Sequence, residues 1–318
     1  MNASPDQAAG LRILVAAPTY RRPQLLATLL ESLSRLVIPE AAEVSFVIID
    51  NDPEAGARRV VSQWQPVFAL PLAYAHEPRP GVSHVRNHAL ALAADMDLIA
   101  FIDDDEFADA GWLSHLVRRY RETRAAAVFG PVTPVYDAAA PDWIRRWGVH
   151  GRPVKADADL ARPGATCNCL IDMGVERKED LSFDPKMTRT GGEDTLFFTR
   201  LLDRGQRLTQ AKDAMVYEHI PAERATPAWL RLRWYRTGLT DAVIAGRHLS
   251  PARARLRGAL QGGLRLAAGG ALTGLVFLLT LGLNRREITA RSYTFWRGAG
   301  MLAFAFGRTY EAYGQTPA

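Results

Sequence analysis

The sequence predicts an α/β protein with a mostly parallel, Rossmann-like central sheet flanked by helices. Short apolar runs with strand character recur at residues 12–18, 44–50, 72–76 and 97–102. Helical spacing fills the gaps between them: leucines mark one face of a segment opened by Pro23, and a second segment covers residues 82–94. Strands that alternate with helices form right-handed βαβ units, whose ligands gather at the carboxyl ends of the strands.

The length of 318 residues fits one catalytic domain with an extension, which we place at residues 1–225 and 226–318. The apolar fraction of 48% and the charged fraction of 23% are ordinary for a globular protein and argue against disorder. Cys167 and Cys169 are too close in sequence for an ordinary disulfide, so we expect reduced strand residues. The first ten residues lack the pattern of a secretory signal, which predicts a cytoplasmic catalytic part.

The acidic run from Asp103 to Glu106 directly follows the apolar residues 98–102. Four adjacent carboxylates at the end of a buried strand need a positive partner, and a divalent cation supplies one. Oxygen ligands of this kind suit Mg²⁺ or Mn²⁺, which commonly neutralise phosphate oxygens. The alternative interpretation is a solvated acidic turn.

Two other predicted strands end in polar residues, at 18–21 and at 50–52, and should share this crevice with the acidic run. No Gly-x-Gly-x-x-Gly sequence follows the first strand, and no Walker-type loop occurs in the sequence. A bound diphosphate would therefore depend on a metal ion and on basic side chains.

Five short motifs occur along residues 11–225: Ala17-Pro-Thr-Tyr-Arg-Arg-Pro23, Val47-Ile-Ile-Asp-Asn-Asp52, Pro80-Gly-Val-Ser-His-Val-Arg-Asn87, Asp103-Asp-Asp105 and Gly191-Gly-Glu-Asp-Thr195. In these motifs and their order, the chain resembles the inverting glycosyltransferases of family 2, which have the GT-A fold and use nucleotide-diphosphate sugars. The resemblance includes bacterial exopolysaccharide glucosyltransferases of the succinoglycan type.

The resemblance implies a donor site that contacts the base, ribose and diphosphate of a nucleotide sugar. Asn51 stands where the family usually has Asp, although uracil stays the favoured base. An Asp-Asn-Asp-Pro sequence is also a good turn, so a purely structural role is the alternative there. The implied donor residues are Pro18, Thr19, Tyr20, Arg21, Asp50, Asn51, Arg79, Gly81, Arg86, Asp103 and Asp104.

For the metal and acceptor sides, the resemblance implies that Asp105 and Asp103 bind Mn²⁺ or Mg²⁺ and that His219 completes the metal shell. It makes Asp194 the general base that deprotonates the acceptor hydroxyl, with Glu193 beside it and Asn168 on the acceptor side. The alternative role for the Glu193-Asp194 pair is capping of the helix predicted after it.

The C-terminal region combines a basic and an apolar block. Residues 224–265 hold nine arginines and one acid, and residues 266–283 hold no charge. As a helix the apolar block is about 27 Å long, just short of a ~30 Å hydrocarbon core. We expect a membrane surface, not nucleic acid, as the partner. A re-entrant or interfacial helical pair is preferred over a single span or a buried soluble hairpin.

Together these features predict a membrane-associated glycosyltransferase of bacterial surface polysaccharide synthesis, peripheral or monotopic at the cytoplasmic face of the inner membrane. The acceptor would be a lipid-linked saccharide and the reaction a single in-line displacement with inversion. Two alternatives are a metal-dependent nucleotidyltransferase and a sugar-nucleotide-binding scaffold without turnover.

Overall fold

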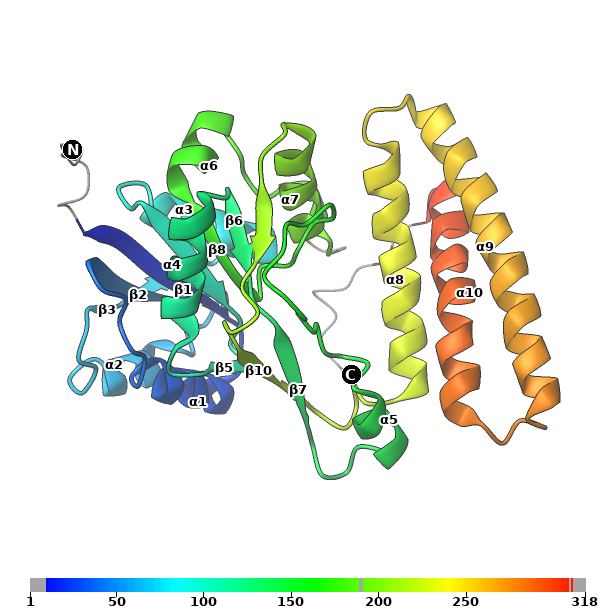
Figure 1. Ribbon diagram of the computed structural model, residues 1–318, viewed down its shortest axis with the longest axis horizontal. Coiled ribbons are helices and arrows are strands. Elements are labelled where there is room, and N and C mark those ends of the chain that lie inside the picture. The colour runs from blue at the N-terminus through cyan, green and yellow to red at the C-terminus, as the bar shows by residue number, and fades with distance from the viewer. Residues whose placement is uncertain (1–9, 189–190, 309, 311–318) are drawn as a thin grey trace. The chain divides into compact units, whose positions relative to one another are not determined.

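The computed structural model describes residues 10–188, 191–308 and 310. Its main sheet has seven strands in the order β3-β2-β1-β4-β8-β6-β9 (Figure 1). The bounds are β1 Leu11–Thr19, β2 Ala42–Asp50, β3 Leu72–His76, β4 Leu98–Ile102, β6 Ala127–Phe129, β8 Asn168–Asp172 and β9 Leu208–Gln210. Strands β1 to β4 pair in parallel, whereas β8 runs antiparallel to β4 and β6. The prediction of a mostly parallel sheet with four early strands is confirmed.

Helices cover both faces of this sheet because alternate side chains of its strands point to opposite sides. Ile13 and Val15 of β1 pack in one apolar cluster with α1 and α4, and Leu14 and Ala16 pack in another with α3 and α7. The helical segments of this part are α1 Pro23–Leu33, α2 Arg58–Trp64, α3 Val82–Leu92, α4 Trp112–Thr123, α6 Met173–Glu179, the 3₁₀ turn η2 Pro185–Met187 and α7 Glu193–Asp203.

The strand register brings four carboxyl ends to one edge of the sheet. Thr19 of β1 is paired with Asp50 of β2, which is in turn paired with His76 of β3. Strand β4 lies on the other side of β1 and ends at Ile102, immediately before the acidic run. The polar residues that follow these strands therefore lie at the same edge.

A second sheet has three short strands in the order β5-β10-β7, with bounds Glu106–Ala108, Val216–Ile220 and Val132–Tyr136. The chain divides into two compact units. The first contains Met1–Pro134, Gly151–Thr188 and Glu193–His219, and the second contains Val135–His150, Arg189–Gly192 and Ile220–Ala318.

The second unit is helical, with α5 Asp142–Trp147, α8 Pro227–Gly246, α9 Pro251–Leu279 and α10 Arg285–Ala305. Helices α9 and α10 form a hairpin, and α10 also packs along α8 (Figure 1). A small core around Ile144, Leu230 and Trp234 joins α5 to α8. By length and composition, α9 alone among the helices of the described residues could cross a membrane.

Candidate active site at the carboxyl ends of the parallel strands

The loop after β1 is fixed by the second acid of the run, Asp104, which is only 5% exposed. Its carboxylate accepts hydrogen bonds from the Thr19 hydroxyl (2.8 Å), the Tyr20 backbone N–H (3.3 Å) and Arg22 Nη1 (2.8 Å). Burial raises the pKa of Asp104, and the charge of Arg22 opposes that rise. Thr19 and Asp104 thus join two strand ends and leave the Tyr20 ring half exposed.

The two residues at the end of β2 use their side chains to shape neighbouring loops. The Asp50 carboxylate accepts hydrogen bonds from Asp52 N–H (2.9 Å), Ala57 N–H (2.9 Å) and the Tyr74 hydroxyl (3.0 Å). Asn51 donates to the carbonyls of Glu77 and Arg79 and accepts from Gly81 N–H. These bonds match the turn-forming alternative for this motif, and direct donor contact by Asp50 and Asn51 stays a prediction.

Arg21 lies beside Tyr20 at the open side of this loop. Its Nε donates to the buried Asp52 carboxylate at 2.9 Å, and its guanidinium lies 5.3 Å from the centre of the Tyr20 ring. Hydrogen bonding and charge from Asp52 raise the pKa of Arg21. An exposed aromatic ring and a guanidinium in this arrangement suit a nucleobase and a phosphate.

Gly81 begins α3 with a backbone that favours glycine, at φ +117°. A Cβ atom there would lie 1.7 Å from Cγ2 of Thr188, so a side chain has no room. Just before it, Arg79 forms a two-pronged ion pair with the Glu77 carboxylate, which lowers the pKa of Glu77. Arg79 is largely exposed and lies at the rim of the same loop.

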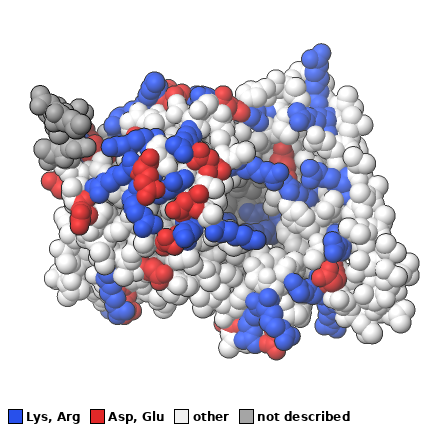
Figure 2. Space-filling model, in the orientation of Figure 1, with Lys and Arg blue, Asp and Glu red and all other residues white. Residues whose placement is uncertain are grey.

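The first and third acids of the run, Asp103 and Asp105, both lie near arginines. Arg22 Nη1 is 2.9 Å from the Asp105 carboxylate, and Arg86 Nη2 is 3.8 Å from that of Asp103. Burial, with a smaller contribution from the neighbouring acids, raises the pKa of Asp103 to about 7 against the opposing charge of Arg86. Acidic and basic side chains are interleaved on the visible face of this unit (Figure 2). Arginines thus already offset part of the repulsion that suggested a metal ion.

The donor set nevertheless fits a hard divalent ion. Mg²⁺ and Mn²⁺ sites that serve phosphates commonly use one or two carboxylates and complete their shells with substrate oxygens and water. Asp103 and Asp105 supply two carboxylates, and the buried Oε1 of Glu106 beside them has no hydrogen-bond partner among the described residues. His219 donates its backbone N–H to the Asp105 carbonyl at 2.8 Å, which places it next to this acid. In the described part of the chain, no three acidic, His or Cys side chains converge as a preformed metal site.

Arg86 connects the acidic run to the start of α7. This arginine is 6% exposed, and its Nη1 donates to the Glu193 carboxylate, which is 4% exposed. Burial raises the pKa of Glu193, while the charge of Arg86 opposes the rise. The neighbouring Asp194 is half-buried and accepts a hydrogen bond from Thr195 N–H at 2.6 Å. The Arg86 side chain therefore lies between Asp103 of the acidic run and Glu193 at the start of α7.

Asn168 is buried at the start of β8 and its side-chain groups are all bonded internally. Its Oδ1 accepts from the Trp112 indole N–H (2.8 Å), and its Nδ2 donates to the carbonyls of Pro131 and Ala214. The geometry supports a structural role, and acceptor contact by Asn168 stays a prediction.

Three residues of this site were not among those predicted from sequence. Arg22 and Asp52 lie inside the sequence motifs given above, but only neighbouring residues of those motifs were predicted to bind the donor. Arg152 comes from a segment without a motif and donates to the Cys167 thiol. The Cys167 side chain contributes most to raising the pKa of Arg152, followed by the charges of Glu218 and Asp194. Arg152 is therefore a third arginine near the acids of the site, after Arg22 and Arg86.

Residues 14–178 match the family model for glycosyl transferase family 2. The succinoglycan biosynthesis protein ExoM of Rhizobium meliloti (strain 1021) is 37% identical over 235 residues, which are 74% of this chain and 75% of that protein.

Solved structures share the fold at low identity. A mannosyltransferase from Pyrobaculum calidifontis in complex with GDP-Man and Mn²⁺ has a TM-score of 0.63 at 19% identity, with 93% of this chain and 87% of that one covered. S. aureus TarS 1-349 in complex with UDP-GlcNAc has a TM-score of 0.53 at 16% identity, with coverage of 94% and 93%. The predicted GT-A fold is confirmed, and the chain belongs to glycosyltransferase family 2.

Proposed function

We propose that this glycosyltransferase moves a sugar, with inversion, from a UDP-sugar to a lipid-linked saccharide in bacterial surface polysaccharide synthesis. The likeness to a succinoglycan biosynthesis protein supports the pathway class. The exposed Tyr20 ring and the arginines around it support a nucleotide diphosphate as the donor.

The observation that carries the proposal is the position of Arg86 between two acidic groups. It lies 3.8 Å from Asp103 on the donor side and is hydrogen bonded to Glu193, which precedes Asp194. A transferase needs its base close to the donor carbon, so that the acceptor oxygen can attack in line. Contact with Arg86 keeps Asp103, assigned to the donor and metal, close to the Glu193-Asp194 pair, assigned to the acceptor.

Each group then has a defined task. Asp194 accepts the proton of the acceptor hydroxyl, and Glu193, held by Arg86, orients the start of α7 around it. Asp105 and Asp103, with His219 beside them, would hold Mn²⁺ or Mg²⁺, which when bound stabilises negative charge on the diphosphate. Arg21 and Arg79 would contact the same diphosphate, since a guanidinium matches phosphate oxygens well. From an α-linked donor, inversion gives a β-linked product.

Product analysis tests the reaction class. Free UDP in the presence of an acceptor supports transfer, whereas release of pyrophosphate supports the alternative nucleotidyltransferase. Binding without either product supports a scaffold. A thermal-shift screen of nucleotide sugars with and without Mn²⁺ selects the donor first, because a ligand at 100 times its Kd adds about 2.7 kcal/mol of stability.

We also propose that residues 226–318 associate the enzyme with the cytoplasmic face of the inner membrane, with residues 1–225 as the catalytic part. The length and hydropathy of α9 support membrane association. This location would give the active site access to an acceptor that is itself anchored in lipid.

A further inference from the structure

Helix α9 packs with its small residues inward and its large apolar residues outward. Gly258, Gly262 and Gly269 are buried against α10, and a Cβ atom on Gly269 would lie 2.3 Å from the Phe295 backbone nitrogen. Soluble helices normally bury their large apolar side chains and expose polar ones. The inverse arrangement is typical of helices whose outer surface meets lipid.

The outward side of α9 carries a row of exposed leucines near each end of the helix. Leu256, Leu260, Leu264, Leu275 and Leu278 fall within an arc of about 100° around the helix axis, and between 53% and 73% of each is exposed. We call these five residues the leucine face. Figure 2 shows the surface over α9 almost without charged side chains. An apolar patch of this length on a soluble protein marks an interaction surface.

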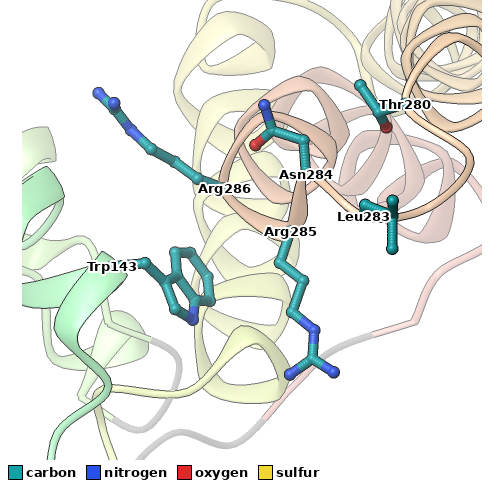
Figure 3. A pocket seen from close by; sticks show the side chains of 6 residues that line it. All are labelled: Trp143, Thr280, Leu283, Asn284, Arg285 and Arg286. Atoms are coloured by element: carbon teal, nitrogen blue, oxygen red, sulfur yellow. The ribbon is translucent and has the colours of Figure 1, made fainter.

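Arginines lie toward both ends of the leucine face, and Arg265 in the middle of α9 lies on the side of the helix opposite Leu256. Arg253, Arg255 and Arg257 lie in the first two turns of α9, and Arg285 and Arg286 begin α10 just after the hairpin turn. Trp143 of α5, Arg285 and Arg286 line a hollow of about 460 Å³. Figure 3 shows Arg285 and Arg286 extending in different directions beside Trp143. Residues 226–318 hold thirteen arginines against three acids, a net charge of +10. This charge is complementary to anionic lipid headgroups.

Charged residues of α10 and α8 limit how deeply the α9–α10 hairpin can enter a bilayer. Arg291 and Arg297 lie within α10, and Arg297 is paired with Asp241 of α8. A hairpin that crossed the bilayer, or entered it turn first, would carry these groups and Arg285 into hydrocarbon. A hairpin that lies flat keeps them on the water side and places only the leucine face in lipid.

We propose that the leucine face lies in the plane of a bilayer containing anionic lipids, with the arginines at its two ends on the headgroups. The inference rests on the proposed membrane association and makes it specific: α9 is an interfacial helix, not a span. The partner is the lipid surface itself.

The first test is co-sedimentation of the full chain with vesicles. Wild-type protein should bind phosphatidylcholine vesicles that contain phosphatidylglycerol, and bind more weakly without it or in high salt. Leu260→Glu/Leu264→Glu/Leu278→Glu should weaken binding by about a hundredfold or more, because it places three charges in the apolar layer. Val67→Glu, at an exposed apolar residue of the first unit, is the matched control and should bind normally. Unchanged binding of the triple variant would overturn the proposal.

The second test measures depth. Nitroxide labels on cysteines placed at Leu256, Leu264 and Leu278 should report similar, shallow depths by oxygen and nickel accessibility. A depth that changes steadily along the helix would show a span instead. Labels that stay water-accessible, or that are protected by self-association in the absence of lipid, would show another partner and overturn the proposal.

UDP release separates this inference from the proposed function. The triple variant should release UDP from the donor in detergent at the wild-type rate, since the leucine face is outside the catalytic residues. Wild-type protein that binds vesicles but never releases UDP would refute the proposed function and leave the lipid inference standing.

Discussion

Replacing Arg86 by Met tests the link between the two acidic groups. The change keeps much of the side-chain volume and removes the cation that both Asp103 and Glu193 face. Arg86 and Glu193 are each less than a tenth exposed, so the loss leaves a buried carboxylate without its partner. Removing one member of a buried pair typically costs about 3–5 kcal/mol, a large part of the stability of a domain.

The pH dependence identifies the cause of that loss. Burial raises the folded-state pKa of Glu193 above its ordinary value, and the Arg86→Met change removes the main charge that opposes this rise. Protonation of Glu193 then favours the folded state, so the Arg86→Met variant should recover stability as the pH falls toward about 5. Adding Glu193→Gln should recover stability at neutral pH for the same reason.

Urea unfolding followed by circular dichroism measures these free energies. Arg35→Met is the control, since both members of its ion pair with Glu31 are exposed and the pair should be worth less than about 1 kcal/mol. If Arg86→Met costs no more than the control, or if Glu193→Gln gives no recovery, the buried bridge does not have the role assigned to it.

Three further predictions concern single sites. Gly81→Ala should cost about 2 kcal/mol or more in urea unfolding, because of its positive φ and the Thr188 methyl group, and Thr188→Ser should recover part of that loss. Burial lowers the pKa of His150 to about 4, so protonation favours the unfolded state; wild-type protein should lose about 2 kcal/mol more stability than His150→Gln between about pH 7 and pH 5. Equal pH slopes would contradict this. Asp105→Ala should abolish Mn²⁺-dependent binding of the nucleotide sugar, and calorimetry that finds an unchanged affinity would remove Asp105 as a metal ligand.

The architecture was predictable because the early strands are apolar, short and separated by strongly periodic helices. Pro23 opens α1 as expected, and the acidic pair lies in the first turn of α7 as expected. A strand near Cys169 was expected, but the antiparallel direction of β8 was not predicted, because strand direction depends on tertiary pairing and not on local pattern.

The details of the site were harder to predict, because sequence gives residue types and not hydrogen-bond partners. Asp50 and Asn51 looked available for a ligand, yet their groups bind the backbone of adjacent loops. The acidic run suggested a cation, and the structure places Arg22 and Arg86 beside it. Arg22 lies 83 positions from Asp105 in the chain, and a contact at this separation carries no local signal in a single sequence.

The turnover of Asp194→Asn tests the central claim most directly. The amide preserves the shape of the side chain and removes the proton-accepting carboxylate, so UDP release with acceptor should fall about 10²–10⁴-fold. Donor and Mn²⁺ affinities should stay near those of the wild type, since Asp194 is assigned to the acceptor. Asn also caps helices well, so a purely structural Asp194 would leave turnover within a few-fold of the wild-type value. That result would contradict the assignment of Asp194 as the base.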